Sequence, residues 1–167
     1  TYATGYIDKA AVFNGSSSRI SFSSSMYDKQ LSHTISLWFN PLSFSASEMI
    51  YWGMDENLRW NSNGTILFKR YSLSAGSRSI NSTTVLSTGV WYHLVISYSN
   101  SSGMALYVNG QLEGTNSSTA NVDTTTGDYG IGYRVDNNNS YSHGSFDQVR
   151  IFNRALDSGE VTQLYNE

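Results

Sequence analysis

The 167-residue chain contains no cysteine and a single proline, Pro41. The lack of cysteine excludes a disulfide framework, a thiol nucleophile and a thiolate metal site. No apolar run approaches the ~18 residues that a membrane-spanning helix needs, so we expect no membrane insertion. The chain begins at Thr1 with neither a methionine nor a charged-then-apolar signal segment, which predicts a mature product or an excised domain.

Charged side chains are also scarce, at 14% of the chain, with 10 Lys+Arg against 13 Asp+Glu and a net charge of −3. This mild acidity argues against nucleic acid and anionic lipid as partners, because both need a basic surface. The polar residues that keep the chain soluble are instead 29 Ser, 13 Thr and 15 Asn, together with 12 Tyr. A low-charge surface rich in hydroxyl and amide groups suits neutral, hydroxylated partners.

Apolar and polar residues alternate over most of the chain, which is the period of a half-buried β-strand. The strongest pair of strands is expected at 91–98 and 104–108, joined by a five-residue loop that suits a hairpin. Many short strands at roughly 8–12-residue spacing predict an all-β fold, an antiparallel two-sheet β-sandwich of the jelly-roll kind. We expect one domain over residues 1–167, because no linker or change in composition divides the chain.

Only the last stretch, from Asp157 to Tyr165, shows helical spacing. Asp157 can cap a short helix, and Glu160 stands three residues further on, as in a capping box. The sequence therefore predicts a short C-terminal helix after the last strand.

Three motifs that follow one another along the chain are specific to one family. The first is AAVFNG at 10–15, followed by Arg and Ile at 19–20. The second runs from WYHLV at 91–95 to LYVNG at 106–110, and the third is GSFDQVRIFNRAL at 144–156. Together they resemble laminin-G-like domains of the concanavalin A-like lectin/glucanase superfamily, and they cover the chain nearly end to end. The family usually has Glu where Gln148 stands and Tyr where Phe152 stands.

The resemblance implies the fold more firmly than it implies a site. It favours a non-catalytic, lectin-like carbohydrate-binding module of a secreted, cell-surface or virion protein, with a glycan or glycoconjugate as the partner. The alternative is a structural or protein-adhesion module that binds a protein receptor and no sugar.

Catalysis is not expected. The glucanase branch of this superfamily cleaves β-glucans with carboxylates in an E-x-D-x-x-E pattern on one strand, where alternate residues share a face. None of the chain's five glutamates opens that pattern, and Asp55 and Glu56 are adjacent, so on a strand they would face opposite ways. The sequence has no G-x-S-x-G motif and no pair of histidines at i, i+4. We therefore predict that the chain is not an enzyme.

Aromatic and acidic side chains in or beside polar loops form the predicted ligand surface. A pyranose has an apolar C–H face and a polar rim, so an aromatic ring can stack on it while a carboxylate accepts its hydroxyl groups. The predicted ligand-binding residues are Trp52, Asp55, Trp60, Tyr133 and Tyr141. Two alternatives stay open: that each ring merely covers a sheet edge, and that the site lies on the concave sheet face near Trp38, His93 and Tyr107.

Many jelly rolls of this superfamily hold a structural Ca²⁺, so the resemblance also implies a calcium site. It points to Asp147 on the closing strand, with Asn14 and nearby carbonyl oxygens of the entry strand as further ligands, since calcium takes oxygen ligands. The competing interpretation is that Asp147 bonds only to Arg150 or to backbone N–H groups.

Overall fold

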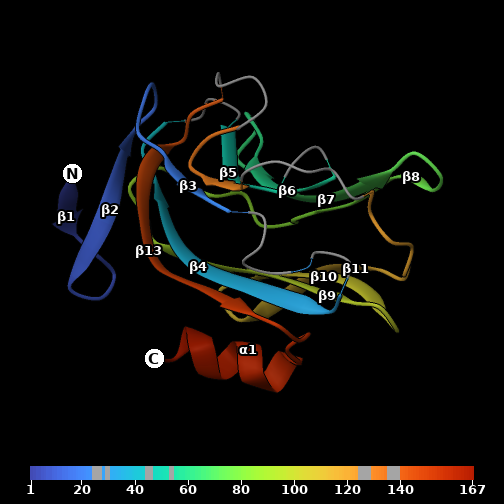
Figure 1. The fold of residues 1–167 in the computed structure, drawn as a ribbon. Coiled ribbons are helices and arrows are strands. Elements are labelled where there is room, and N and C mark those ends of the chain that lie inside the picture. Colours follow the sequence, from blue (N-terminus) through green and yellow to red (C-terminus); the bar gives the residue numbers. More distant parts are fainter. Residues whose placement is uncertain (24–27, 29–30, 44–46, 53–54, 124–128, 135–139) are drawn as a thin grey trace.

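The computed structural model describes residues 1–23, 28, 31–43, 47–52, 55–123, 129–134 and 140–167. Within these residues the chain forms two antiparallel sheets that stack face to face (Figure 1). The predicted two-sheet antiparallel sandwich with a short C-terminal helix is confirmed. No helix among the described residues is long and apolar enough to cross a membrane.

One sheet has seven described strands, in the order β1-β2-β13-β4-β9-β10-β11. These strands are β1 (Tyr2–Thr4), β2 (Lys9–Asn14), β13 (His143–Phe152), β4 (His33–Pro41), β9 (Tyr92–Ser99), β10 (Gly103–Val108) and β11 (Gln111–Asn116). The other sheet has six described strands, in the order β3-β12-β5-β6-β7-β8. These are β3 (Ile20–Phe22), β12 (Tyr129–Ile131), β5 (Ser47–Trp52), β6 (Glu56–Trp60), β7 (Ile66–Ser72) and β8 (Gly76–Asn81).

Tight turns join the consecutive strands where the sequence predicts them. β9 and β10 form the expected hairpin, in which Gly103 pairs with Ser99. β10 then turns into β11 through Asn109 and Gly110, whose φ angles are +51° and +75°. Asparagine and glycine are the residues that adopt two successive positive φ values at low cost, so this turn follows from the local sequence.

Alternate residues of the central strands fill the space between the two sheets. On β4 these are Ile35, Leu37 and Phe39, each 0% exposed. Phe68 of β7 and Trp60 of β6 face them, and the Trp60 ring meets Phe39 edge to face with centroids 5.3 Å apart. Burying a large apolar side chain contributes about 1.5–3 kcal/mol, so these contacts between the sheets stabilise the sandwich.

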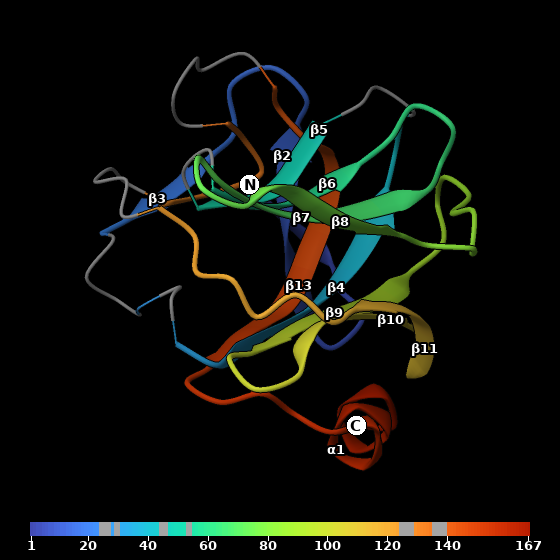
Figure 2. The same ribbon diagram turned by 90° about the vertical axis from the view of Figure 1, so that its right-hand side faces the viewer.

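The helix α1 (Ser158–Tyr165) covers the outer face of the seven-stranded sheet (Figures 1 and 2). Asp157 caps it as predicted, accepting from the backbone N–H of Glu160, while the Glu160 side chain accepts from the backbone N–H of Asp157. Val161 of the helix packs with Val95 and Tyr107 of the sheet in a second, smaller apolar cluster. Part of this face of the sandwich is therefore covered by the chain itself.

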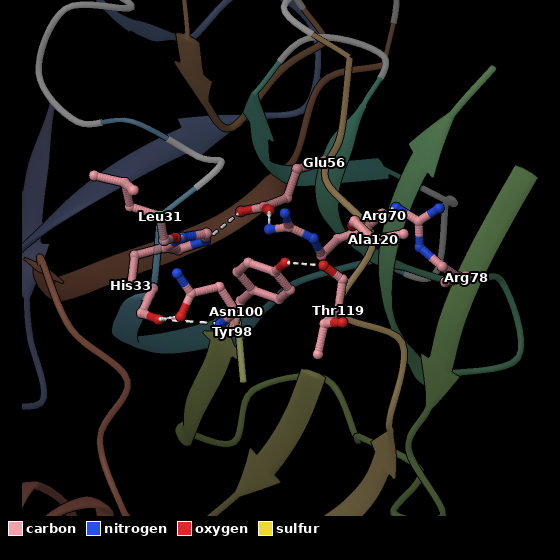
Figure 3. Close-up of polar contacts among 10 residues, drawn as sticks. Leu31, His33, Glu56, Arg70, Arg78, Tyr98, Asn100, Thr119 and Ala120 are labelled. Carbon is pink, nitrogen blue, oxygen red and sulfur yellow. Dashed lines mark hydrogen bonds and ion pairs between the residues drawn. The ribbon is translucent and has the colours of Figure 1, made fainter. Parts of the chain in front are cut away.

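Charged side chains bridge the two sheets inside the sandwich (Figure 3). Glu56 of β6 and Arg70 of β7 are each 0% exposed, and His33 of β4 in the opposite sheet is 1% exposed. Arg70 donates to one carboxylate oxygen of Glu56, and the other oxygen lies 2.7 Å from Nε2 of His33. Nδ1 of His33 lies 2.8 Å from the carbonyl oxygen of Leu31. The carboxylate of Glu56 is thus held from both sheets at once.

The guanidinium of Arg70 also rests on an aromatic ring of the opposite sheet. Its Cζ lies 3.4 Å from the ring centroid of Tyr98, a cation–π contact away from water. The Tyr98 hydroxyl donates to the carbonyl oxygen of Thr119 at 2.9 Å, and Arg78 donates to that of Ala120 at 3.1 Å (Figure 3). The polar cluster therefore also holds the coil that leaves β11.

The same two strands present a different set of side chains outward. Glu56 pairs with Arg70 across β6 and β7, and the next pair along, Asn57 with Lys69, points to the opposite face. The register that buries the ion pair therefore also sets which residues stand side by side on the outer face of the six-stranded sheet.

We predict that Arg70→Met lowers the free energy of unfolding by roughly 3–5 kcal/mol, because it leaves a buried carboxylate without its guanidinium partner. Urea unfolding followed by far-ultraviolet circular dichroism measures the change. Arg154→Met is the matched control, since it breaks the exposed ion pair between Arg154 and Glu160, and it should change stability little. Equal effects of the two substitutions would contradict this role of the buried pair.

Candidate functional site

Two of the predicted ligand residues lie inside the protein. Trp60 is 1% exposed, and the expectation that it lies in a surface loop outside the core is wrong. The reason is the phase of β6, in which Glu56, Leu58 and Trp60 alternate toward the core. Asp55, in the turn before β6, is 2% exposed, so the expectation of a surface carboxylate is also wrong. Its backbone carbonyl accepts from the N–H of Tyr71 at 2.7 Å, which draws the turn onto β7.

Tyr133 and Tyr141 are the members of the predicted set that the structure brings together. Their rings stack with centroids 6.1 Å apart, and the Tyr133 hydroxyl lies 2.7 Å from Oγ of Ser21. Tyr133 is buried and Tyr141 is partly buried. Trp52 is the last residue of β5, and its side chain lies outside the described part of the structure. Among the described side chains of the predicted set, the pair that lies together is therefore Tyr133 and Tyr141, beside β12.

The residues predicted to bind calcium do not form one site. In the sheet Asn14 stands opposite His143, and Asp147 is four residues further along β13, which is about 13 Å. The side-chain oxygen of Asn14 accepts from the backbone N–H groups of Ser16, Ser17 and Ser18 and closes that turn. The donor set of Asn14 and Asp147 therefore does not fit a shared ion, and no cluster of three metal-ligating side chains occurs among the described residues.

Asp147 instead serves the backbone, as its alternative interpretation held. Its two carboxylate oxygens accept from the N–H of Ile7 at 2.9 Å and from that of Gln148 at 2.8 Å. Gln148 has a φ of +47° at a bulge in β13, and the carboxylate bond holds it there. A Cβ added to Gly5 would lie 2.5 Å from the same carboxylate, so the N-terminal segment packs directly on Asp147.

The alternative site near Trp38, His93 and Tyr107 lies on the outer face of the seven-stranded sheet, beneath α1. Trp38 is 5% exposed, because Tyr6 stacks on it at 3.4 Å between ring centroids and Tyr165 of α1 stacks at 5.7 Å. His93 is 1% exposed, and its Nε2 lies 2.7 Å from Oγ of Ser36. Burial, together with the nearby Arg150, lowers the pKa of His93 to about 4. The part of this face around Trp38 and His93 is thus covered by the chain itself, while a pocket of about 420 Å³ lies beside the start of α1 and is lined in part by Tyr107.

The outer face of the six-stranded sheet carries a groove of about 360 Å³. We call it the outer groove. Its lining side chains come from β5, β6, β7 and the segments that follow β7 and β12: Tyr51, Asn57, Arg59, Lys69, Tyr71, Leu73 and Arg134. Two rings, one amide and three cations thus line one depression, a combination that can stack on and hydrogen-bond to a polar ligand.

The floor of the outer groove is made by Tyr51 and Asn57, which are neighbours across β5 and β6. They are 1% and 6% exposed. The side-chain oxygen of Asn57 is buried and accepts no hydrogen bond from the described residues. Most buried polar atoms in proteins are bonded, so this acceptor beside the groove is available to a donor from a ligand or from water.

Cations and rings stand beside that floor. Nζ of Lys69 lies 5.6 Å from the ring centroid of Tyr71, and Cζ of Arg134 lies 5.6 Å from that of Tyr51. Arg134 directly follows Tyr133, so the stacked tyrosines of the predicted set lie next to the outer groove along the chain.

Sequence reasoning missed the members of the outer groove on β6 and β7. The signal available was alternation, since Asn57 and Arg59 share one face of β6 while Lys69 and Tyr71 share one face of β7. Alternation by itself does not say which face is covered.

In sequence, the chain matches the family model described as the concanavalin A-like lectin/glucanases superfamily, of laminin G type, over residues 14–162. No curated protein sequence matches it significantly.

Several solved structures share the fold. Domain 4 of AbnA, a GH43 extracellular arabinanase from Geobacillus stearothermophilus solved in complex with arabinotriose, has a TM-score of 0.80 and 23% identity, over 99% of this chain and 80% of that chain. The binding domain of Paraclostridial Mosquitocidal Protein 1 has a TM-score of 0.81 and 18% identity, over 99% of this chain and 45% of that one. The SAP-like pentraxin of Limulus polyphemus has a TM-score of 0.70 and 18% identity, over 92% of this chain and 80% of that one.

We predict that Asp147→Ala lowers the free energy of unfolding by about 1–3 kcal/mol, because two backbone N–H groups lose their acceptor. The loss should be the same in calcium as in excess chelator, since it comes from backbone hydrogen bonds. Urea unfolding of both proteins in the two buffers checks this. A loss seen only in calcium would show that Asp147 holds an ion.

We also predict a pH-dependent component of stability from His93. Its pKa is lower in the folded chain, so the unfolded chain takes up the proton first as the pH falls below about 6.5. Stability should therefore be complete above that pH and decrease toward pH 4, by roughly 1–2 kcal/mol at pH 5. His93→Gln should flatten this part of the curve when unfolding is compared at pH 7 and pH 5, and an unchanged slope would contradict the assignment.

Proposed function

The chain belongs to the concanavalin A-like lectin/glucanases superfamily, and on that basis we propose that it is a non-catalytic carbohydrate-binding module whose ligand lies in the outer groove. The observation that carries the proposal is the floor of that groove, where the unbonded amide oxygen of Asn57 lies beside the ring of Tyr51. A sugar supplies what this floor lacks, since its hydroxyl groups are donors and its C–H face packs on aromatic rings.

The shape and exposure of the two sheets support this location. On the outer face of the seven-stranded sheet, α1 and Tyr6 cover the area around Trp38, whereas Leu73, at the rim of the outer groove, is 83% exposed. A binding module needs a face that its own chain leaves accessible, and the outer groove lies on such a face.

The chemistry of the lining supports binding without catalysis. Glycoside hydrolysis uses two carboxylic acids that flank the scissile bond. The described residues that line the outer groove include no carboxylic acid. The nearest carboxylate along β6, that of Glu56, points into the core and is engaged by Arg70 and His33.

The structural neighbours support a glycan as the partner. The arabinanase domain was solved with arabinotriose, so a domain of this fold can hold an oligosaccharide. Its parent enzyme is described as extracellular, and another neighbour is the binding domain of a toxin. We place this module accordingly in a secreted, cell-surface or virion protein that binds a glycan or glycoconjugate.

We predict that Tyr71→Ala weakens glycan binding by about tenfold to a hundredfold, the equivalent of about 1–3 kcal/mol for a lost aromatic contact. Asn57→Ala should weaken it comparably, because a ligand hydroxyl loses its acceptor. A glycan array identifies the ligand, and calorimetric titration of that glycan measures each variant.

Tyr2→Ala is the matched control for Tyr71→Ala, since Tyr2 is 78% exposed on β1 of the other sheet, and it should leave the affinity unchanged. Tyr141→Ala tests the alternative location of the site, at the stacked pair of Tyr133 and Tyr141. Loss of binding in that variant alone would move the site to the loop beside β12. A folded protein that binds no glycan on the array but captures a protein receptor would instead favour the adhesion function.

A further inference from the structure

The outer groove is positively charged although the chain as a whole is acidic. Three of the ten lysines and arginines line it, namely Arg59, Lys69 and Arg134, and none of the described side chains that line it is acidic. From this we infer that the ligand is an anionic glycan, a sugar that bears a carboxylate or a sulfate group. The inference rests on the proposed function and names the class of sugar that the outer groove selects.

The strand register brings two of these cations to the same small area. Lys69 stands directly opposite Asn57 in the pairing of β7 with β6. Arg59 is two residues beyond Asn57 on β6, so it points to the same face. Directly paired side chains have Cβ atoms about 4.5–5.5 Å apart, and diagonal neighbours are about 7–8 Å apart. Both cations therefore lie within the span of one or two sugar rings placed over Asn57.

Arg59 and Lys69 have no acidic partner among the described residues. Elsewhere in the described residues, the arginines at 70, 150 and 154 each form an ion pair with a glutamate. Arg59 and Lys69 form no ion pair within the described part of the chain, and Nε of Arg59 is buried without a hydrogen-bond acceptor there. Like charges left close together repel each other, so an anion entering the outer groove is attracted by both.

The uncharged residues that line the outer groove favour an anionic sugar over a simple inorganic anion. A guanidinium binds a carboxylate or sulfate through two parallel hydrogen bonds. The amide of Asn57 and the rings of Tyr51 and Tyr71 then match the hydroxyl groups and C–H faces that the same molecule carries. The composition of the chain predicted a neutral, hydroxylated partner, and the outer groove is where the local charge departs from that average.

The experiment compares glycans that differ only in charge. The probes for the carboxylate arm are tetragalacturonic acid and its methyl ester, with 3′-sialyllactose and lactose as a second pair. The probes for the sulfate arm are a sulfated galactan tetramer and its desulfated form. Affinities are measured by calorimetric titration at about 0.05 M and about 0.5 M sodium chloride, since salt screens exposed charges.

The variants test whether the charge acts in the outer groove. Arg59→Gln and Lys69→Gln each remove one cation, and each should weaken binding of the charged probe by about tenfold. Lys9→Gln is the matched control, because it removes the same charge from an exposed position on β2 of the other sheet. The two groove variants should also bind with a weaker dependence on salt than the wild type.

The results separate this inference from the proposed function. At least tenfold preference for the charged member of one pair, lost in Arg59→Gln and Lys69→Gln but kept in Lys9→Gln, supports the anionic glycan. Equal or tighter binding of the neutral member overturns the inference and leaves carbohydrate binding intact. Binding of inorganic sulfate with the affinity of the sulfated tetramer would show an anion site without sugar recognition. Binding of none of the probes, charged or neutral, contradicts both.

Discussion

The buried ion pair between Glu56 and Arg70 is the constraint on which the arrangement of the six-stranded sheet depends. Each charge is removed from water, so it is tolerated only while its partner stands opposite it. A slip of β7 by one residue against β6 would turn Arg70 toward the outer face and bring Lys69 into the core, leaving Glu56 buried without its partner. The register that buries Glu56 and Arg70 therefore also determines which side chains line the outer groove, because the ion pair and the groove lie on opposite faces of β6 and β7.

The two outer faces of the sandwich are used in different ways. On the seven-stranded sheet, Trp38 is covered by Tyr6 and Tyr165, and the apolar residues beside it pack against α1. On the six-stranded sheet, the strands leave a groove with an unbonded amide at its floor. A sheet that buries one face in the core can have its other face covered by a helix of the same chain or left accessible to a partner, and we propose that this chain uses the first arrangement on the seven-stranded sheet and the second on the six-stranded sheet.

The described acidic residues are largely occupied in holding the framework together. Asp147 accepts from two backbone N–H groups, Glu113 accepts from two threonines, and Glu160 pairs with Arg154 and closes the cap of α1. None of these carboxylates forms an ion pair with Arg59 or Lys69. A chain with a net charge of −3 thereby keeps a local positive charge where the proposed ligand binds.

Local sequence determined the elements, and tertiary packing determined the site. The turn at Asn109 and Gly110 and the capping of α1 by Asp157 were predictable, because each depends on interactions within a few residues. The family motifs and the alternation of apolar residues likewise indicated the two-sheet sandwich. Trp60 was assigned to the surface wrongly, and Asn57 and Lys69 were missed, because alternation names two faces of a strand without saying which one meets the core. Which face of each strand meets the core was decided only by the tertiary structure. The packing of the sheets, the position of α1 and the pairing of β6 with β7 all depend on contacts between residues far apart in the sequence, and local sequence patterns do not specify such contacts.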